Sequence, residues 1–287
     1  MKTVRCSSAF TLIELLVVIS ILGILTALTV PALKNLGKSN IQTSAARQLL
    51  DDVGRAHQLA INQHTTVYMV FVPTNFCNVP FTNGLGTISS ATNQYLAFAA
   101  ATNLMASQLT GYNFLTYGKL GDQPGQHQWH YSDQWQKLPD GNMIAAAKFS
   151  PLDNVCRIPL WESQNAGRIE NWRAGKFQIY AFTNISVPFP TENSPLVPMP
   201  CLIFNYLGHL VSETDGGSFY DAYIPLAQGS VSYGIDPATK SPILTTTPVG
   251  TGDITENPPG NSTNISFNVV HIDALTGRAT LEFYKLP

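Results

Sequence analysis

A single carboxylate, Glu14, interrupts the longest apolar stretch of this chain. The stretch runs from Phe10 to Val30, and Glu14 is its only charged residue. As an α-helix these 21 residues extend roughly 31 Å, which matches the hydrocarbon thickness of a bilayer. A carboxylate inside such a segment costs about 2.5–3.5 kcal/mol on membrane-insertion scales. We therefore expect a chain that keeps Glu14 in this segment to use it.

The residues that flank this carboxylate resemble a known processing signal. A short polar leader with Lys2 and Arg5 precedes the segment A-F-T-L-I-E-L-L-V-V-I-S-I-L-G-I-L, which begins at Ala9. The segment is similar to the N-terminus of type IV pilins and type II secretion pseudopilins. In that family a prepilin peptidase cuts before the Phe and methylates the new amino group. The resemblance implies that residues 1–9 are a leader, removed by cleavage between Ala9 and Phe10, and that Phe10 is N-methylated.

The same resemblance assigns roles to three residues after the cut. Glu14 becomes the fifth mature residue and accepts the charged, methylated amino group of Phe10, either its own or a neighbour's. Gly23 and Pro31 stand where the family commonly has a helix-loosening Gly and a kinking Pro. One departure is visible, because Ala9 occupies the position before the cut where the family usually has Gly.

An ordinary secretory signal and a plain membrane anchor are the alternatives for this segment. A secretory signal has an uninterrupted apolar core and a small-x-small cleavage site. Here Glu14 interrupts the core, and no A-x-A site precedes Lys34. A plain anchor explains the length but not the F-T-L-I-E sequence. The prepilin interpretation implies that residues 10–33 cross the cytoplasmic membrane once and later pack against other pilins or pseudopilins.

The composition indicates one sizeable extracytoplasmic domain rich in strands and loops. Hydrophobic residues make up 44% of the 287 residues, and charged residues only 12%, about half the usual share. The formal net charge is −2. Without the leader, Lys and Arg fall from 16 to 14 against 18 acids, which gives −4 for the mature chain. A mildly acidic protein does not attract nucleic acid by its overall charge, so we do not expect a nucleic-acid partner.

Three cysteines remain after the leader with Cys6 is removed: Cys77, Cys156 and Cys201. In an oxidising compartment, one disulfide and one spare thiol are possible among them. The spacing leaves the pairing open. It also predicts no metal site, and we expect no cofactor.

The N-terminal helix is predicted to continue past the apolar stretch and to be followed by a strand. After break signals at residues 34–38, apolar residues recur in steps of three and four, which indicates one face of a helix packed on a sheet. These residues are Ile41, Ala45, Leu49, Val53, Ala56 and Ala60. The β-branched and aromatic run of residues 65–72 predicts the first strand.

The remainder divides into an insertion and a C-terminal sheet. Residues 73–200 are heterogeneous and are predicted to be a large insertion subdomain, which ends in a Pro-rich connector. Residues 201–207 and 209–211 flank Gly208 as a hairpin, and residues 265–272 and 278–283 form another. With residues 34–72 and 201–287 as the pilin-like domain, we expect an α+β fold, in which a long N-terminal transmembrane helix packs on an antiparallel β-sheet.

Three segments of this domain resemble H-type minor pseudopilins and FimT-like minor pilins. They are the helix-to-strand passage of residues 56–72, the segment I-F-N-Y-L-G-H-L-V from Ile203, and the C-terminal V-V-H-I-D-A-L-T-G-R-A-T-L. FimT-like pilins of competence systems bind DNA through a basic motif with two Arg after a Gly. Here Gly277-Arg278-Ala279-Thr280 lacks the second Arg, so DNA uptake is the less favoured role.

Other candidate sites in the sequence are weak. His127 and His130 have a metal-ligand spacing, but the nearby Pro and Gly indicate a loop without a third ligand. The oxygen-rich segment from Glu213 to Asp221 is either a calcium loop or an ordinary acidic turn. Four tryptophans in the insertion form either a second small core or an exposed surface that stacks on sugars; they are Trp129, Trp135, Trp161 and Trp172.

Since none of the common catalytic motifs is present, we do not expect an enzyme; a membrane-anchored enzyme is the weakest alternative. The leading hypothesis is a structural minor pilin or pseudopilin that is assembled into a pseudopilus or type IV pilus-like fibre serving protein secretion. Its C-terminal domain then lies in the periplasm or outside the cell. The alternative is a pilus-associated module that binds a glycan or a surface.

Overall fold

A computed structural model describes most of the chain as two compact units, Met1–Thr43 and Ser44–Pro287. The described residues are 12–74, 76, 99–118, 121–122, 128–149, 155–158, 177–212, 220–240, 254–262 and 267–284. Within these ranges the side chains of residues 28–41, 155–158, 177–180, 267 and 284 are not described.

Helix α1 (Leu12–Gln63) contributes to both units and is continuous. The prediction that the N-terminal helix continues past the apolar stretch is confirmed, because α1 runs through residues 34–38 despite the break signals there. Of these residues only Gly37 is a poor helix former, at a cost of about 1 kcal/mol relative to Ala. The helical hydrogen bonds of its neighbours are sufficient to carry α1 through the segment. The helix also continues through Pro31, which removes one backbone hydrogen bond.

The larger sheet of the Ser44–Pro287 unit has seven strands in the described residues and is antiparallel throughout. Strand β1 lies at its centre, with Met69 opposite Phe114 of β2 on one side and opposite Leu202 of β9 on the other. The strands are β1 (Val67–Phe71), β2 (Gly111–Tyr117), β3 (Trp129–Tyr131), β4 (Gln136–Lys137), β8 (Thr183–Pro188), β9 (Leu196–Phe204) and β10 (Leu210–Val211).

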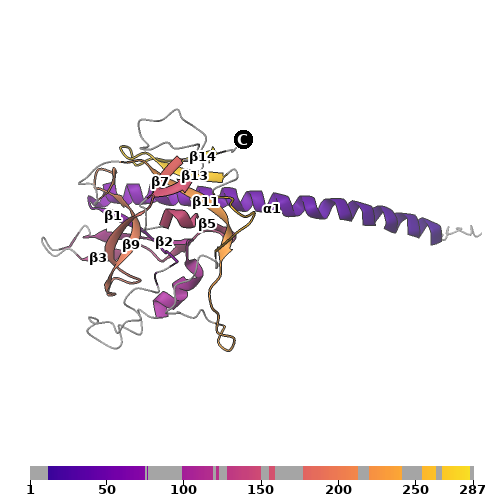
Figure 1. Cartoon of the computed structure of the whole chain (residues 1–287), viewed down its shortest axis with the longest axis horizontal. Helices are drawn as coiled ribbons and strands as arrows, with labels where there is room; N and C mark the ends of the chain where they lie inside the picture. Colours follow the sequence, from indigo (N-terminus) through magenta and orange to yellow (C-terminus); the bar gives the residue numbers. More distant parts are fainter. Residues whose placement is uncertain are drawn as a thin grey trace, which may run out of the picture. The chain divides into compact units, whose positions relative to one another are not determined.

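A second antiparallel sheet has five strands in the part of the chain that the structure describes. Its path is β12-β11-β13-β14, and β5 pairs with β11. Figure 1 shows β13 and β14 side by side. The strands are β5 (Asn142–Ile144), β11 (Ala222–Val231), β12 (Ile254–Glu256), β13 (Phe267–Ile272) and β14 (Ala279–Tyr284). A separate antiparallel pair is formed by β6 (Val155–Ile158) and β7 (Phe177–Tyr180).

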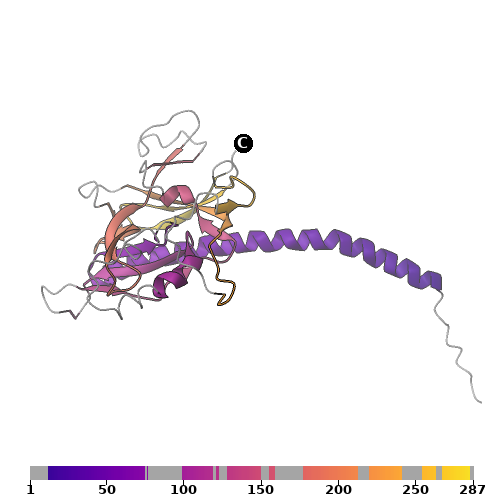
Figure 2. The same cartoon turned by 60° about the horizontal axis from the view of Figure 1, so that its bottom comes forward.

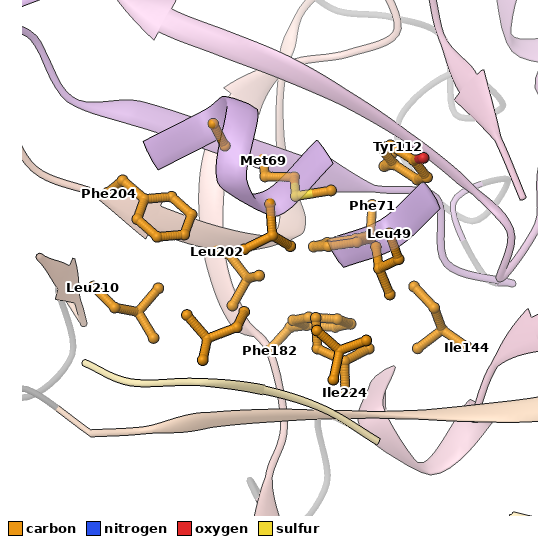
Figure 3. Packing of buried hydrophobic residues seen from close by; sticks show 14 of the residues in the cluster. Leu49, Met69, Phe71, Tyr112, Ile144, Phe182, Leu202, Phe204, Leu210 and Ile224 are labelled. Atoms are coloured by element: carbon orange, nitrogen blue, oxygen red, sulfur yellow. The ribbon is translucent and has the colours of Figure 1, made fainter. Parts of the chain in front are cut away.

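The main core lies where the two large sheets and α1 meet. Of the apolar stripe predicted from Ile41 to Ala60, the residues from Ala45 to Ala60 are completely buried there, and the side chain of Ile41 is not described. In Figure 2 this part of α1 passes between the two sheets. Figure 3 shows Leu49 close to Phe71 of the first sheet and Ile144 of the second. The helix thus contacts both sheets at once, and for that reason its buried face is apolar along four turns.

The opposite face of the larger sheet carries a second core, and several strands from the range of the predicted insertion lie in the two large sheets. Within residues 73–200, strands β2, β3, β4 and β8 belong to the larger sheet and β5 to the second sheet. The described strands of this range thus complete both large sheets, except β6 and β7, which pair with each other; the insertion subdomain itself stays a prediction. Backbone pairing between strands far apart in sequence produces this result. The predicted α+β class with antiparallel sheets and an N-terminal helix is confirmed.

Candidate functional site

The first described turns of α1 expose an apolar surface. Every side chain from Leu12 to Ala27 is exposed. The exposed fraction of the large apolar side chains ranges from 45% at Val18 to 86% at Leu12. A contiguous apolar surface of this extent marks contact with a membrane or with other protein chains. No helix within the described residues is long and apolar enough to cross a membrane.

The polar side chains of this segment suit apolar surroundings. The Ser20 hydroxyl donates to the Leu16 carbonyl at 2.7 Å, and the Thr26 hydroxyl donates to the Leu22 carbonyl at 2.9 Å. Both hydroxyls therefore need no partner outside the helix. Glu14 lies exposed in the first turn of α1, where the positive end of the helix dipole favours a carboxylate. Glu14 is thus the one charge that the apolar surface offers to a cation.

Gly23 lies in the middle of this exposed surface, and its role is not intramolecular packing. A Cβ atom added at Gly23 would meet nothing within 4 Å. A glycine inside a helix costs about 1 kcal/mol relative to Ala, so packing within the described chain gives no reason for it. Small residues allow helices to approach closely in membranes. Of the other predicted residues, Ala9 and Phe10 lie outside the described residues, and Pro31 lies in α1 with its side chain not described.

The three segments that resemble H-type minor pseudopilins meet at the imidazole of His57. Gly208 in the β9–β10 turn and Gly277 in the β13–β14 turn both adopt positive φ, at 83° and 63°. A Cβ atom added at Gly208 would lie 2.5 Å from His57 Nε2. One added at Gly277 would overlap both the Gly208 carbonyl oxygen and His57 Cδ2. The two glycines therefore form the walls of a narrow slot that holds the His57 ring.

Backbone and ring contacts complete this slot. The Leu210 amide donates to the Ala274 carbonyl at 2.9 Å, which joins the two turns. Phe204 packs edge-on against His57 at 6.3 Å between ring centroids. Burial lowers the pKa of His57 below its ordinary value of 6.5, and the nearby charges of Arg278 and His209 lower it further. The slot therefore holds a neutral imidazole at neutral pH.

A second cluster joins β11, β13 and β14 around His271. Its Nδ1 lies 2.7 Å from Glu282 Oε1, and its Nε2 lies 3.2 Å from Asp221 Oδ2. Tyr223 stacks on the ring at 4.4 Å between centroids. The other oxygen of Asp221 accepts the Ala274 amide at 2.9 Å. Since the carboxylates lie on opposite ring nitrogens, His271 and both acids do not converge on one point as metal ligands would.

Sequence reasoning missed both histidine clusters. The signal for the His57 slot was present, because each predicted hairpin has a Gly at its turn. Only the fold brings Gly208 and Gly277 to the same helix face. No local pattern indicated the cluster at His271, since its partners come from two other strands. Within the described residues, no group of three or more His, Cys, Asp or Glu side chains forms a possible metal site.

The other candidates fall partly outside the described residues. His130 lies 3.4 Å from Asp122 in an ion-pair geometry, whereas His127 lies outside. Of the calcium-loop residues, Glu213 lies outside, and Asp221 belongs to the His271 cluster. Cys201 is buried in β9 and its thiol donates to the Met199 carbonyl at 3.3 Å. Cys77 and the side chain of Cys156 lie outside, so the disulfide stays a prediction.

The two described tryptophans pack against other aromatic rings. Trp129 lies 5.4 Å from Tyr68 and 4.8 Å from Tyr117 between ring centroids. Trp135 packs on Phe189 at 5.4 Å, and its indole nitrogen donates to the Pro190 carbonyl at 3.1 Å. Both rings are half-buried against the second core. The remaining pair, Trp161 and Trp172, lies outside the described residues.

Comparison with known proteins gives one match. Residues 4–30 match the family described as the prokaryotic N-terminal methylation motif. Neither the curated proteins nor the solved structures contain a match to this chain. The matched motif supports the type IV pilin and pseudopilin superfamily and indicates a prepilin-like substrate of type IV pilin processing. It implies processing by a prepilin peptidase and assembly with other pilins. The H-type subgroup stays a prediction.

Proposed function

We propose that this chain is a structural minor pilin or pseudopilin subunit that is assembled into a pseudopilus or type IV pilus-like fibre serving protein secretion. One observation carries the proposal: the methylation motif of residues 4–30 coincides with an apolar helix surface that is exposed and bears one carboxylate, Glu14. Such a surface needs a membrane first and neighbouring helices later. The role is structural and not enzymatic.

In this proposal Glu14 sets the position of the subunit along the fibre. Cleavage between Ala9 and Phe10 creates a charged amino group four residues before Glu14. Pairing this amino group with Glu14 of a neighbour offsets the burial of both charges. A shifted helix would leave two unpaired charges in apolar surroundings, which costs several kcal/mol. The open space at Gly23 supports a close approach of a neighbouring helix.

Processing is tested by the intact mass of the protein purified from its native membrane. We expect a chain that begins at Phe10 and carries one N-methyl group. Retention of Met1, or a mature N-terminus after Ala27, would contradict the proposal.

Assembly is tested with Glu14→Ala in sheared-fibre preparations. We expect the variant to insert into the membrane normally, because it lacks the costly charge, and to be depleted from fibres at least tenfold. Ser20→Ala is a matched control, since its hydroxyl bonds within the helix. If Glu14→Ala is incorporated as well as the control, Glu14 does not position the subunit.

The alternative of a glycan- or surface-binding module gains no support from the described tryptophans, because Trp129 and Trp135 are used in packing. The structural subunit is therefore the function that we propose.

A further inference from the structure

Strand β14 forms an open edge of the second sheet. It is the last strand in the order β12-β11-β13-β14 among the described residues. Its partner β13 pairs with it without interruption, from Ile272 opposite Ala279 to Phe267 opposite Tyr284. The strand is therefore regular along its whole length. An open, regular edge strand is a template for pairing with another chain.

The outward backbone groups of β14 can be assigned from one hydrogen bond. The Asp273 amide donates to the Arg278 carbonyl at 3.0 Å, so the backbone of Arg278 faces β13. In an antiparallel ladder this direction alternates along the strand. Thr280 and Glu282 therefore also face β13, whereas Ala279, Leu281 and Phe283 direct their N–H and C=O groups to the open edge. These three residues supply the donors and acceptors for a new strand.

The side chains of β14 do not protect this edge. Natural edge strands avoid pairing by means of Pro, Lys, bulges or short length. The sequence A-T-L-E-F-Y of β14 has neither Pro nor Lys, and its one charged residue is Glu282. Leu281 is 41% exposed and Phe283 is 62% exposed. Two large apolar side chains at an open edge favour contact with a partner.

The charges near β14 indicate which partner fits. Arg278 and Glu282 lie four residues apart and project from the same face of the strand, because side chains alternate; Glu282 also contacts His271 Nδ1 at 2.7 Å, so in the dimer it would bridge His271 and the second copy's Arg278. Thr280 lies midway between Arg278 and Glu282. If β14 pairs antiparallel with itself about Thr280, Arg278 of each copy lies opposite Glu282 of the other. Opposite charges and Thr–Thr pairs at such positions stabilise a sheet.

The backbone supports this same register. Centred on Thr280, Ala279 lies opposite Leu281 of the second copy, and these residues carry the outward donors and acceptors. Centring on Leu281 keeps the hydrogen bonds but removes the Arg–Glu pairs. Centring on Glu282 sets two carboxylates against each other, which is destabilising. The register about Thr280 satisfies both the hydrogen bonds and the charges.

We propose that β14 pairs antiparallel with β14 of a second copy of this chain, centred on Thr280, to form a two-fold dimer through a continuous sheet. A two-fold contact closes on itself and does not propagate. The contact therefore limits assembly through β14 to a dimer, and it does not depend on the function proposed above.

The first test is a disulfide crosslink in the full-length chain, purified in detergent micelles and treated with a mild oxidant. In the proposed register the two Thr280 residues form a non-hydrogen-bonded pair with Cα atoms about 4.5 Å apart, within disulfide reach. The two Leu281 residues are offset by two positions, at about 8 Å, which is too far. We expect Thr280→Cys to give a covalent dimer at least tenfold above both Leu281→Cys and the wild type.

The second test uses the charges in the Thr280→Cys background. Arg278→Glu alone sets Glu against Glu. Glu282→Arg alone sets Arg against Arg and also removes the contact of Glu282 with His271. Each should lower the homodimer fraction about tenfold. A mixture of the two, distinguished by size tags, should give mainly the mixed dimer, because both opposite-charge pairs are then restored. This restoration also shows that the two variants are folded.

Three results would overturn the proposal. They are a Thr280→Cys crosslink no stronger than that of Leu281→Cys, a mixture without preference for the mixed dimer, and a chain that remains monomeric. Association through the N-terminal helix alone would crosslink Thr280→Cys and Leu281→Cys equally, so it counts against the proposal.

Discussion

Replacing Gly208 with alanine tests how the two hairpin turns are seated on α1. Gly208 has φ of 83°, a conformation that L-residues with a side chain rarely adopt. The new methyl group would lie 2.5 Å from His57 Nε2, 2.8 Å from His57 Cδ2 and 2.9 Å from Ile61 Cδ1. All three are shorter than an ordinary contact, so either the ring or the turn must move.

The expected loss of stability has a backbone part and an overpacking part. The left-handed backbone conformation costs alanine roughly 1–2 kcal/mol, and the reduced entropy of the unfolded chain returns about 0.4–1 kcal/mol. Overpacking a filled site adds about 1–3 kcal/mol. We therefore expect Gly208→Ala to lower the free energy of unfolding by about 2–4 kcal/mol.

Substitutions at two other glycines separate the backbone part of the cost from the overpacking part. Gly141 has φ of 85°, and a Cβ atom added there would meet nothing within 4 Å. Gly141→Ala should therefore cost only the backbone part, about 1 kcal/mol. At Gly277 the added Cβ would overlap the Gly208 carbonyl oxygen, a backbone atom that no side-chain change removes. Gly277→Ala should cost about 3 kcal/mol or more.

The assay is urea unfolding of the full-length chain in a mild detergent, followed by tryptophan fluorescence. In a His57→Ala background the ring that obstructs Gly208 is absent. Gly208→Ala should then cost about 1–2 kcal/mol, because Ile61 Cδ1 still lies 2.9 Å from the new methyl group; this gives an interaction free energy of about 1–2 kcal/mol in the double-mutant cycle. Gly277→Ala should be relieved much less. The reasoning is refuted if Gly208→Ala costs no more than Gly141→Ala, or costs the same with and without His57.

Two further changes address the attachment of α1 and its pH dependence. The buried Tyr112 hydroxyl donates to Asp52 at 2.5 Å, so Tyr112→Phe should lower the free energy of unfolding by about 1.5–3 kcal/mol. The control Tyr206→Phe, at an exposed site, should change it by less than about 0.5 kcal/mol. Equal effects of the two changes in urea unfolding would contradict this prediction. Burial and Arg278 lower the pKa of His57 in the folded chain below 6.5. As the pH decreases, His57 is therefore protonated in the unfolded chain before it is protonated in the folded chain, and the free energy of unfolding should fall as the pH decreases below 6.5. His57→Gln should remove part of that slope between pH 7 and pH 5, and an unchanged slope would show that other groups cause it.

The sequence by itself determined the features that depend on neighbouring residues. The N-terminal motif, the buried stripe from Ala45 to Ala60 and both C-terminal hairpins follow from local pattern. Alternation, helical spacing and turn glycines act within a few residues, so they can be read directly. The predicted continuation of the N-terminal helix is confirmed as well, because the weak break signals at residues 34–38 do not stop a helix whose adjacent turns continue it.

Only the tertiary structure decided how distant segments combine. It placed β9 beside β1 and used strands from residues 73–200 to complete both sheets. It also enclosed His57 between Gly208 and Gly277, and His271 between Asp221 and Glu282. Strand pairing and side-chain packing between such segments depend on the closure of long loops and on the complementarity of whole surfaces. Neither loop closure nor surface complementarity produces a periodic pattern in the sequence, so these sites can be identified only from the folded structure.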